Sequence, residues 1–145
     1  MALRGVALAD EALLGGDGRG AAILRDSFEE ATAALCAEAV GIMARTLELT
    51  TDYLKTRQQF GVAIGSFQAL QHRAVDMLIQ LELARSMATL AALSLDQPPE
   101  QRRRSIAAAK VQIGRSGRFI GQQAVQLHGA IGVTAEYEVG HASSG

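Results

Sequence analysis

Apolar positions recur with a helical period along most of this chain. Between residues 36 and 54 apolar or small side chains follow one another at alternating steps of 4 and 3 residues. That spacing places them on one face of a helix. The stripe consists of Cys36, Val40, Met43, Leu47, Thr50 and Leu54. We expect this helix to start between Asp17 and Ala21, and we take Gly61 as its stop signal.

Two further segments show the same period. The second helix is predicted over residues 67–95 and should end at the Pro98-Pro99 pair, because proline cannot continue a helix interior. Its stripe is Phe67, Leu70, Ala74, Met77, Leu81, Ala84, Ala88, Ala91 and Leu95. The third helix is predicted over residues 100–128, with Ile106, Ala109, Ile113, Ile120, Ala124 and Leu127 on one face. The pattern therefore predicts an all-α fold, an antiparallel bundle of three long helices.

Glycine punctuates the chain in two places. Residues 15–20 include Gly15, Gly16, Gly18 and Gly20, which indicates a turn, and Gly5–Asp10 before it fits a short strand. The third helix contains Gly114, Gly117 and Gly121. Each glycine costs roughly 1 kcal/mol relative to alanine inside a helix. We therefore expect these three positions to pack closely against another helix or a ligand.

Composition narrows the class of protein. With 145 residues, 48% of them apolar, and a net charge of -1, the chain suits one globular domain and gives no electrostatic reason to expect nucleic acid as a partner. The basic run Arg102–Arg104 is interpreted as a solvated helix start. No apolar run reaches the length of a membrane span. The single cysteine, Cys36, excludes an internal disulfide, so the cytoplasm is the expected compartment.

The wide apolar faces of the predicted helices favour an oligomer. Three helices of this kind seldom bury all of their apolar surface on one another, and a contiguous exposed apolar patch usually marks an interface. We therefore expect an oligomer.

Candidate chemistry lies at the junction between the first two helices. Arg57 there is open to two interpretations, a cap on the last carbonyls of the helix or a ligand for an anion. Phe60 and Phe67 bracket the junction, and core packing is the more common role of such residues. Gln68 either hydrogen-bonds a ligand or faces water.

A second candidate turn follows the third helix, at Gln126-Leu127-His128-Gly129-Ala130-Ile131-Gly132. Its glycines allow backbone amides to approach a phosphate or a ribose, but glycine after a helix is more often only a C-cap. A lone histidine such as His128 is more often structural than catalytic. The sequence shows no metal-ligand spacing, nucleophile motif or phosphate-binding loop.

Taken together, the two turns carry a specific pair of motifs. The first reads Tyr53-x-x-x-Arg57-x-Gln59-Phe60-Gly61-x-x-Ile64-x-x-Phe67-Gln68, and the second reads Gln126-x-His128-Gly129-x-x-Gly132-x-Thr134-x-Glu136-Tyr137. In this order and at this separation they resemble the C-terminal helical domain of acyl-CoA dehydrogenases. The opening, Asp10…Leu14-Gly15, is similar to the end of the middle β domain of that family.

The resemblance implies a flavoprotein. Members of the family are commonly tetramers that oxidise an acyl-CoA thioester between Cα and Cβ, with a carboxylate base for the proton and FAD for the hydride. It implies that Arg57 binds the FAD pyrophosphate, often across a subunit interface, and that Phe60, Phe67 and Gln68 lie at the same cofactor. It further implies that the second turn contributes Gln126, Leu127, His128, Gly129 and Ala130.

The catalytic base of the family is not visible in these residues. Many members carry it in a later Glu-Gly-Thr segment, and this sequence stops at His141-Ala142-Ser143-Ser144-Gly145. Others carry it on the first helix, where the matching position is Ala31. Glu29 and Glu30 should point elsewhere, because helical neighbours are about 100° apart. No catalytic residue is therefore assigned.

The expected protein is a fragment or truncated form of an acyl-CoA dehydrogenase, inactive alone. Residues 1–20 would be a remnant of the β domain and a linker, residues 21–140 the C-terminal helical domain, and residues 141–145 a disordered or artificial tail. The alternative is a non-catalytic helical assembly subunit that completes a partner dehydrogenase.

Overall fold

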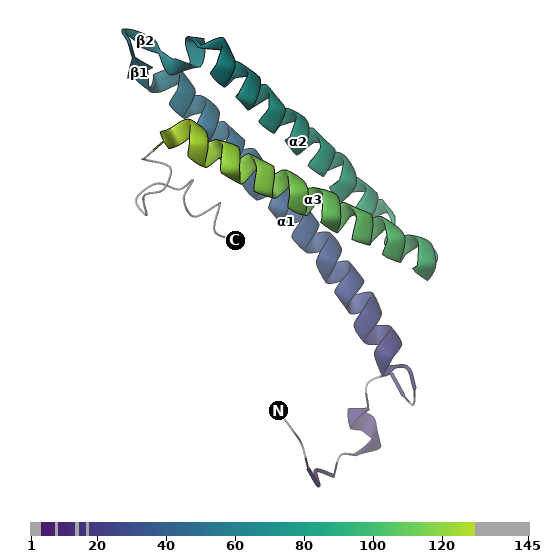
Figure 1. The fold of residues 1–145 in the computed structure, drawn as a ribbon. Helices are drawn as coiled ribbons and strands as arrows, with labels where there is room; N and C mark the ends of the chain where they lie inside the picture. The colour runs from purple at the N-terminus through teal and green to yellow at the C-terminus, as the bar shows by residue number, and fades with distance from the viewer. Residues whose placement is uncertain (1–3, 8, 14, 17, 130–145) are drawn as a thin grey trace.

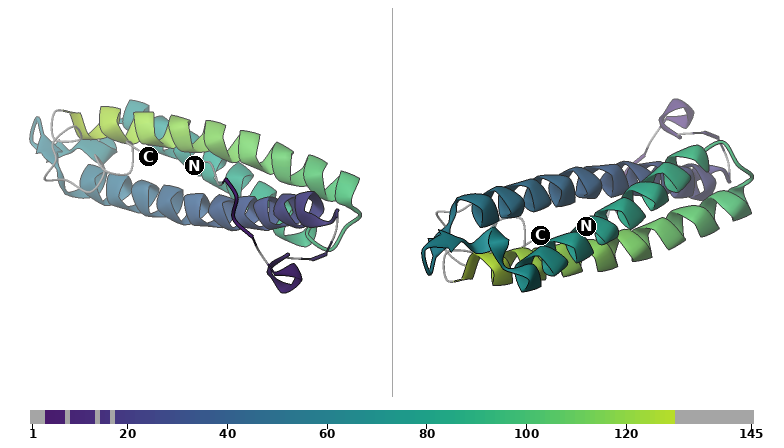
Figure 2. Two further views of the ribbon diagram at one scale, coloured as in Figure 1. Left: turned by 90° about the horizontal axis from the view of Figure 1, so that it is seen from below. Right: turned by 90° about the horizontal axis from the view of Figure 1, so that it is seen from above.

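Three long helices form the body of the molecule. A computed structural model describes residues 4–129 except 8, 14 and 17. Helices α1 (Gly20–Thr56), α2 (Gln68–Leu93) and α3 (Pro99–His128) pack side by side (Figure 1). Successive helices run antiparallel, so α1 and α3 terminate at the same end of the bundle (Figure 2). The predicted all-α bundle is confirmed, whereas Ala130, the end of the domain near residue 140 and the tail at 141–145 lie outside the described residues.

The predicted stripe of α1 faces the core. All of its members are buried except Val40, which is half-buried. The helix ends at Thr56, earlier than Gly61, because Arg57 leaves the helical conformation with ψ 125°. The amide of Arg57 still donates a hydrogen bond of 2.9 Å to the Tyr53 carbonyl, which closes the last turn.

A hairpin that the sequence analysis did not predict follows α1. Strands β1 (Gln58–Gln59) and β2 (Val62–Ala63) pair antiparallel, and η2 (Ile64–Ser66) leads into α2. The two loop residues, Phe60 and Gly61, have φ values of 54° and 79°. Positive φ at both loop positions matches the tight turn that suits the twist of a hairpin. Strands of two residues are too short to show an alternating pattern.

The cores of α2 and α3 follow the predicted period. In α2, four side chains are at most 2% exposed, namely Met77, Leu81, Ala84 and Ala91. In α3, all six predicted core positions are at most 6% exposed. A buried polar chain also joins the two helices, because Gln112 donates to the Ser116 hydroxyl (3.1 Å) and that hydroxyl donates to Gln80 (3.0 Å). Burial of the hydroxyl is thus compensated by hydrogen bonds.

The segment before α1 is less regular than expected. Its described residues contain the short 3-10 helix η1 (Asp10–Ala12) and no strand, so the strand predicted at Gly5–Asp10 is wrong for them. Among the described residues, no second strand lies beside this segment to satisfy the backbone groups of such a strand. The predicted glycine turn is confirmed, since Gly15, Gly16 and Gly18 have φ between 74° and 79°.

Apolar side chains also cover the outside of the bundle. Large apolar residues that are at least 44% exposed occur on all three helices, namely Leu24, Phe28, Leu35, Ile42, Val75, Leu78, Ile79, Leu83, Leu90, Leu93 and Val111. Within the described ranges, none of the helices is long and apolar enough to cross a membrane.

Candidate functional site

The junction after α1 presents a cation to solvent. Arg57 is exposed, and its backbone fixes the start of the hairpin, because its carbonyl accepts a hydrogen bond of 2.8 Å from the Ile64 amide. Its guanidinium forms no hydrogen bond or ion pair with the part of the chain that the structure describes. The side chain therefore does not cap the carbonyls of α1, and it is available to an anion.

Two aromatic rings belong to the same junction as this arginine. Phe60 at the hairpin tip is 90% exposed and Phe67 at the start of α2 is 40% exposed. Their ring centroids are 6.3 Å apart in an edge-to-face arrangement. The interpretation of these residues as core packing is wrong, because a two-residue loop projects Phe60 away from the helices. The pair forms an open apolar surface at this end of the bundle.

The start of α2 is fixed tightly against α1. Gln68 is the first residue of α2 and is exposed, so its amide is free to meet either water or a ligand. The Gln71 amide nitrogen donates to the Gly65 carbonyl at 2.8 Å. A Cβ at Gly65 would lie 2.8 Å from the Leu54 carbonyl oxygen, so only glycine lets η2 approach α1 this closely.

The second predicted turn begins where α3 ends. Gln126 is exposed, whereas Leu127 and His128 are 6% and 3% exposed. Gly129 has φ 62°, and its amide donates to the Val125 carbonyl. That amide is therefore already engaged in capping α3. Ala130, the last predicted member of the turn, lies outside the described residues.

A ring contact joins the two predicted turns. The ring of Tyr53 stacks on that of His128 with centroids 4.5 Å apart and planes inclined by 28°. Tyr53 stands four residues before Arg57, and His128 directly precedes Gly129. The helical period of apolar residues did not predict this contact of Tyr53. The signal that could have indicated it is the place of Tyr53 in the first motif. The structure thus brings the ends of α1 and α3 together, as Figure 1 shows.

The opposite end of the bundle holds an ion-pair cluster. Arg102 of α3 bonds Glu29 through Nε and Oε2 at 2.5 Å and also pairs with Asp26, while Arg103 reaches Glu29 at 3.4 Å. The Arg102 side chain is only 16% exposed, so the interpretation of the basic run as a solvated helix start is wrong for this residue. Its carbon stem lies at the α1–α3 contact, and its charge is satisfied by two carboxylates.

The same cluster controls the basicity of Glu29. The hydrogen bond from Arg102 holds the pKa of Glu29 below its usual value of 4.5, against the opposing effect of burial, and Arg103 lowers it further. A carboxylate in this state is a weak base. Among the described residues, no group of three or more histidine, cysteine, aspartate or glutamate side chains is placed to hold a metal ion.

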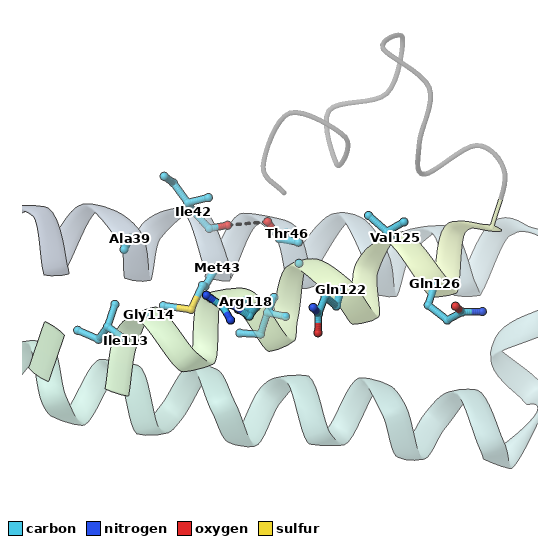
Figure 3. A pocket seen from close by; sticks show the side chains of 13 residues that line it. Ala39, Ile42, Met43, Thr46, Ile113, Gly114, Arg118, Gln122, Val125 and Gln126 are labelled. Atoms are coloured by element: carbon cyan, nitrogen blue, oxygen red, sulfur yellow. Dashed lines mark hydrogen bonds between the residues drawn. The ribbon is translucent and has the colours of Figure 1, made fainter. Parts of the chain in front are cut away.

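A groove runs between α1 and α3. Its volume is about 840 Å³, and Ala39, Ile42 and Met43 form its α1 wall, with Ile113, Gly114 and Gly117 opposite (Figure 3). Figure 3 also shows Gln122 and Gln126 along the same wall, toward the end of α3. Among the described residues, a Cβ on Gly117 would meet only Met43 Sδ at 3.8 Å, and one on Gly114 would meet no atom within 4 Å. Neither glycine is therefore required for close packing within the described part of the chain.

Comparison with known proteins places these features in a family. A family model described as "Acyl-CoA dehydrogenase, C-terminal domain" matches residues 18–143. The L-prolyl-[peptidyl-carrier protein] dehydrogenase of Serratia sp. is 39% identical over 127 residues, which are 88% of this chain and 32% of that protein. The chain thus spans about a third of that relative.

Solved structures show the same relationship. The glutaryl-CoA complex of glutaryl-CoA dehydrogenase matches with a TM-score of 0.86 and 30% identity, over 94% of this chain and 34% of that one. PigA, solved with FAD and proline, matches with a TM-score of 0.80 and 37% identity, over 89% of this chain and 33% of that one. The chain therefore belongs to the acyl-CoA dehydrogenase family of flavoproteins, and its helices form that family's C-terminal domain.

Proposed function

We propose that this chain supplies part of the FAD site and of the oligomer interface of an FAD-dependent acyl-CoA dehydrogenase. The observation that carries the proposal is the exposed Arg57 guanidinium, which has no partner in the described part of the chain. It lies at the same end of the bundle as the turn at Gly129, and the Tyr53–His128 stack connects the two.

The residues at this end fit the cofactor chemically. A pyrophosphate needs a cation with paired donors, which a guanidinium offers. The exposed rings of Phe60 and Phe67 offer an apolar surface to a flat ring system. Gln68 and Gln126 are exposed at the ends of α2 and α3 and add amide donors and acceptors. When bound, FAD would supply hydride acceptance, and these residues would bind and orient it. Leu127, His128, Gly129 and Ala130 are assigned to the backbone of the second turn.

The isolated chain is proposed to lack dehydrogenase turnover. Removal of an α proton needs a carboxylate whose pKa is tuned for that work. Glu29 is held in ion pairs, and the position that carries the base in some relatives is Ala31. The acyl-CoA substrate would therefore be processed only in the complete enzyme.

The open groove and the exposed apolar surface support an oligomeric assembly. Gly114 borders the groove with nothing within 4 Å of its missing Cβ, so its cost to α3 is not offset inside the described chain. We propose that packing in the complete protein offsets the helix cost of this glycine. The assembly would be a homo-dimer, a homo-tetramer or a hetero-oligomer with a dehydrogenase subunit. Within this proposal, residues 1–20 link to a β domain, residues 21–140 form the helical domain and residues 141–145 a tail. The buried free thiol of Cys36 fits a reducing compartment such as the cytoplasm.

A second candidate function follows from the same surface. If the apolar groove and the outer faces serve for packing against a partner and the cofactor residues bind no FAD, the chain is a non-catalytic assembly subunit that completes a partner dehydrogenase. In that case the fold is retained for packing, and FAD binding belongs to the partner.

Titration of the purified chain with FAD, followed by flavin fluorescence or calorimetry, separates these candidates. Saturable binding that is weakened in Arg57→Ala but not in Arg104→Ala supports the cofactor site. Arg104 is a matched control because it is 82% exposed and lies near the start of α3, at the opposite end of the bundle. Absence of binding at high protein concentration favours the assembly subunit. Robust flavin reduction by acyl-CoA with the chain alone would contradict the proposed lack of turnover.

A further inference from the structure

The stack of Tyr53 on His128 joins the end of α1 to the end of α3. The two rings come from the last turns of α1 and α3, which the chain separates by the hairpin, the whole of α2 and most of α3. Their centroids are 4.5 Å apart, and His128 is 3% exposed. A stacked pair of this kind holds two backbone segments at one spacing.

Hydrogen bonds connect each of these two residues to one of the two turns. On the α1 side, the Tyr53 carbonyl accepts the Arg57 amide at 2.9 Å, and the Arg57 carbonyl accepts the Ile64 amide at 2.8 Å. Through these two bonds, the position of the Tyr53 backbone determines the position of the hairpin. On the α3 side, His128 Nδ1 lies 2.8 Å from the Ala124 carbonyl, which fixes the ring against its own helix. The carbonyl can only accept, so Nδ1 is the donor. The next residue is Gly129, whose amide closes the C-cap on Val125.

We propose that Tyr53 and His128 are positioning residues that couple the Arg57 turn to the Gly129 turn. The stack keeps the spacing between the two turns constant, so a displacement of one turn is transmitted to the other. This inference rests on the proposed function in one respect, because a fixed spacing matters to a ligand only where both turns contact it. The coupling itself is a property of this chain and is measurable without any ligand.

The coupling differs from a general stabilising role of the same rings. A residue that only stabilises the bundle would, when truncated, raise amide exchange throughout the chain. A coupling residue would loosen one particular distant turn. The reporting groups are the Ile64 amide, bonded to Arg57, and the Gly129 amide, bonded to Val125.

Hydrogen exchange followed by NMR tests the coupling. In His128→Ala we expect the Ile64 amide to exchange about two- to tenfold faster, the factor that a ring pair of ordinary strength can supply. In Tyr53→Ala we expect the same change at the Gly129 amide. His128→Phe and Tyr53→Phe keep a ring at each position and should restore wild-type exchange.

A matched control and a second readout complete the test. Ile106→Ala truncates a buried side chain near the start of α3, remote from both turns. If Ile64 exchanges no faster in His128→Ala than in Ile106→Ala, measured at equal global stability, the coupling is overturned. Affinity for FAD should fall by a similar two- to tenfold in both alanine variants and recover in both phenylalanine variants. If the wild-type chain binds no FAD, the proposed function fails, and the exchange data alone decide whether the coupling exists.

Discussion

Glu29 of α1 and Arg102 of α3 form an ion pair across the helix contact, with 2.5 Å between Oε2 and Nε and side chains only 10% and 16% exposed. Both charges are removed from most of their water, and each depends on the other for compensation. The pair stands at the end of the bundle opposite the proposed cofactor site.

Truncation of Arg102 should therefore destabilise the chain more than truncation of Arg104. Arg102→Ala leaves the Glu29 carboxylate buried with only the weaker Arg103 contact at 3.4 Å. We expect the midpoint of thermal unfolding to fall by several degrees. Circular dichroism at fixed protein concentration measures this midpoint. Arg104→Ala removes an exposed charge whose nearest carboxylate is 3.9 Å away and should change the midpoint little. Equal midpoints for the two variants would contradict this assignment.

The same pair predicts a pH dependence of stability. The pKa of Glu29 is lowered below 4.5 in the folded chain, chiefly by the hydrogen bond from Arg102. The folded state therefore holds the proton less tightly than the unfolded state, so this contribution is complete above about pH 4.5. It is lost as the pH falls through the lowered pKa. The Arg102 pKa is raised by the same bond, so its charge persists throughout. The stability difference between wild type and Glu29→Gln should shrink when unfolding is measured below pH 4.5.

Two glycines should respond to alanine with opposite signs. In Gly65→Ala the new Cβ would lie 2.8 Å from the Leu54 carbonyl oxygen and 3.2 Å from its carbon, and backbone atoms cannot rotate away. Overpacking of this kind typically costs about 1–3 kcal/mol. We expect a lower unfolding midpoint and a shift of η2 away from α1, visible as chemical-shift changes in residues 64–66. An unchanged midpoint would mean that η2 does not approach α1 this closely.

Gly114→Ala is the opposite case. This residue lies inside α3 on the wall of the groove, and no atom of the described residues would lie within 4 Å of its Cβ. Replacing glycine in a helix interior should stabilise the chain by roughly 1 kcal/mol, seen as a higher unfolding midpoint. The bulkier Gly114→Leu should retain that gain in the isolated chain and weaken whatever assembly fills the groove. Sedimentation velocity at several concentrations measures the second effect, and unchanged self-association in Gly114→Leu would exclude the groove as an interface.

Features with a helical period could be predicted from the sequence. The core of α3, from Ile106 to Leu127, was identified from spacing alone because one face of a long helix repeats regularly. The hairpin at Gln58–Ala63 could not be, because two-residue strands have no period and depend on φ values of 54° and 79° in the loop.

The two ends of the bundle also differ in how far the sequence predicted them. Arg57 and the Gly129 turn were located through their motifs, since the glycines and the arginine stand at fixed positions in the sequence. The Glu29–Arg102 pair joins residues 73 apart, so it exists only through the packing of α3 on α1. Local charge patterns made Arg102 look solvated. The roles of the cofactor residues remain predictions for the titration to decide.

Phe60 combines high exposure with an unfavourable backbone conformation. Its φ is 54°, its side chain is 90% exposed, and its ring reaches Phe67 only at 6.3 Å between centroids. A bulky residue in the left-handed region is uncommon, and asparagine adopts that region more readily. Strain at such a position is often retained for function.

Phe60→Asn should therefore move stability and cofactor affinity in opposite directions. We expect the free energy of unfolding to rise by up to about 1 kcal/mol, since backbone strain is relieved and little packing is lost. Affinity for FAD should fall, because the exposed ring surface at the site is removed. Phe28→Asn provides a matched control, since Phe28 is 69% exposed within α1, where asparagine brings no relief of strain. Denaturant unfolding and FAD titration of the three chains measure both quantities. A loss of stability in Phe60→Asn would show that the ring contributes packing, and unchanged FAD affinity would remove Phe60 from the proposed site.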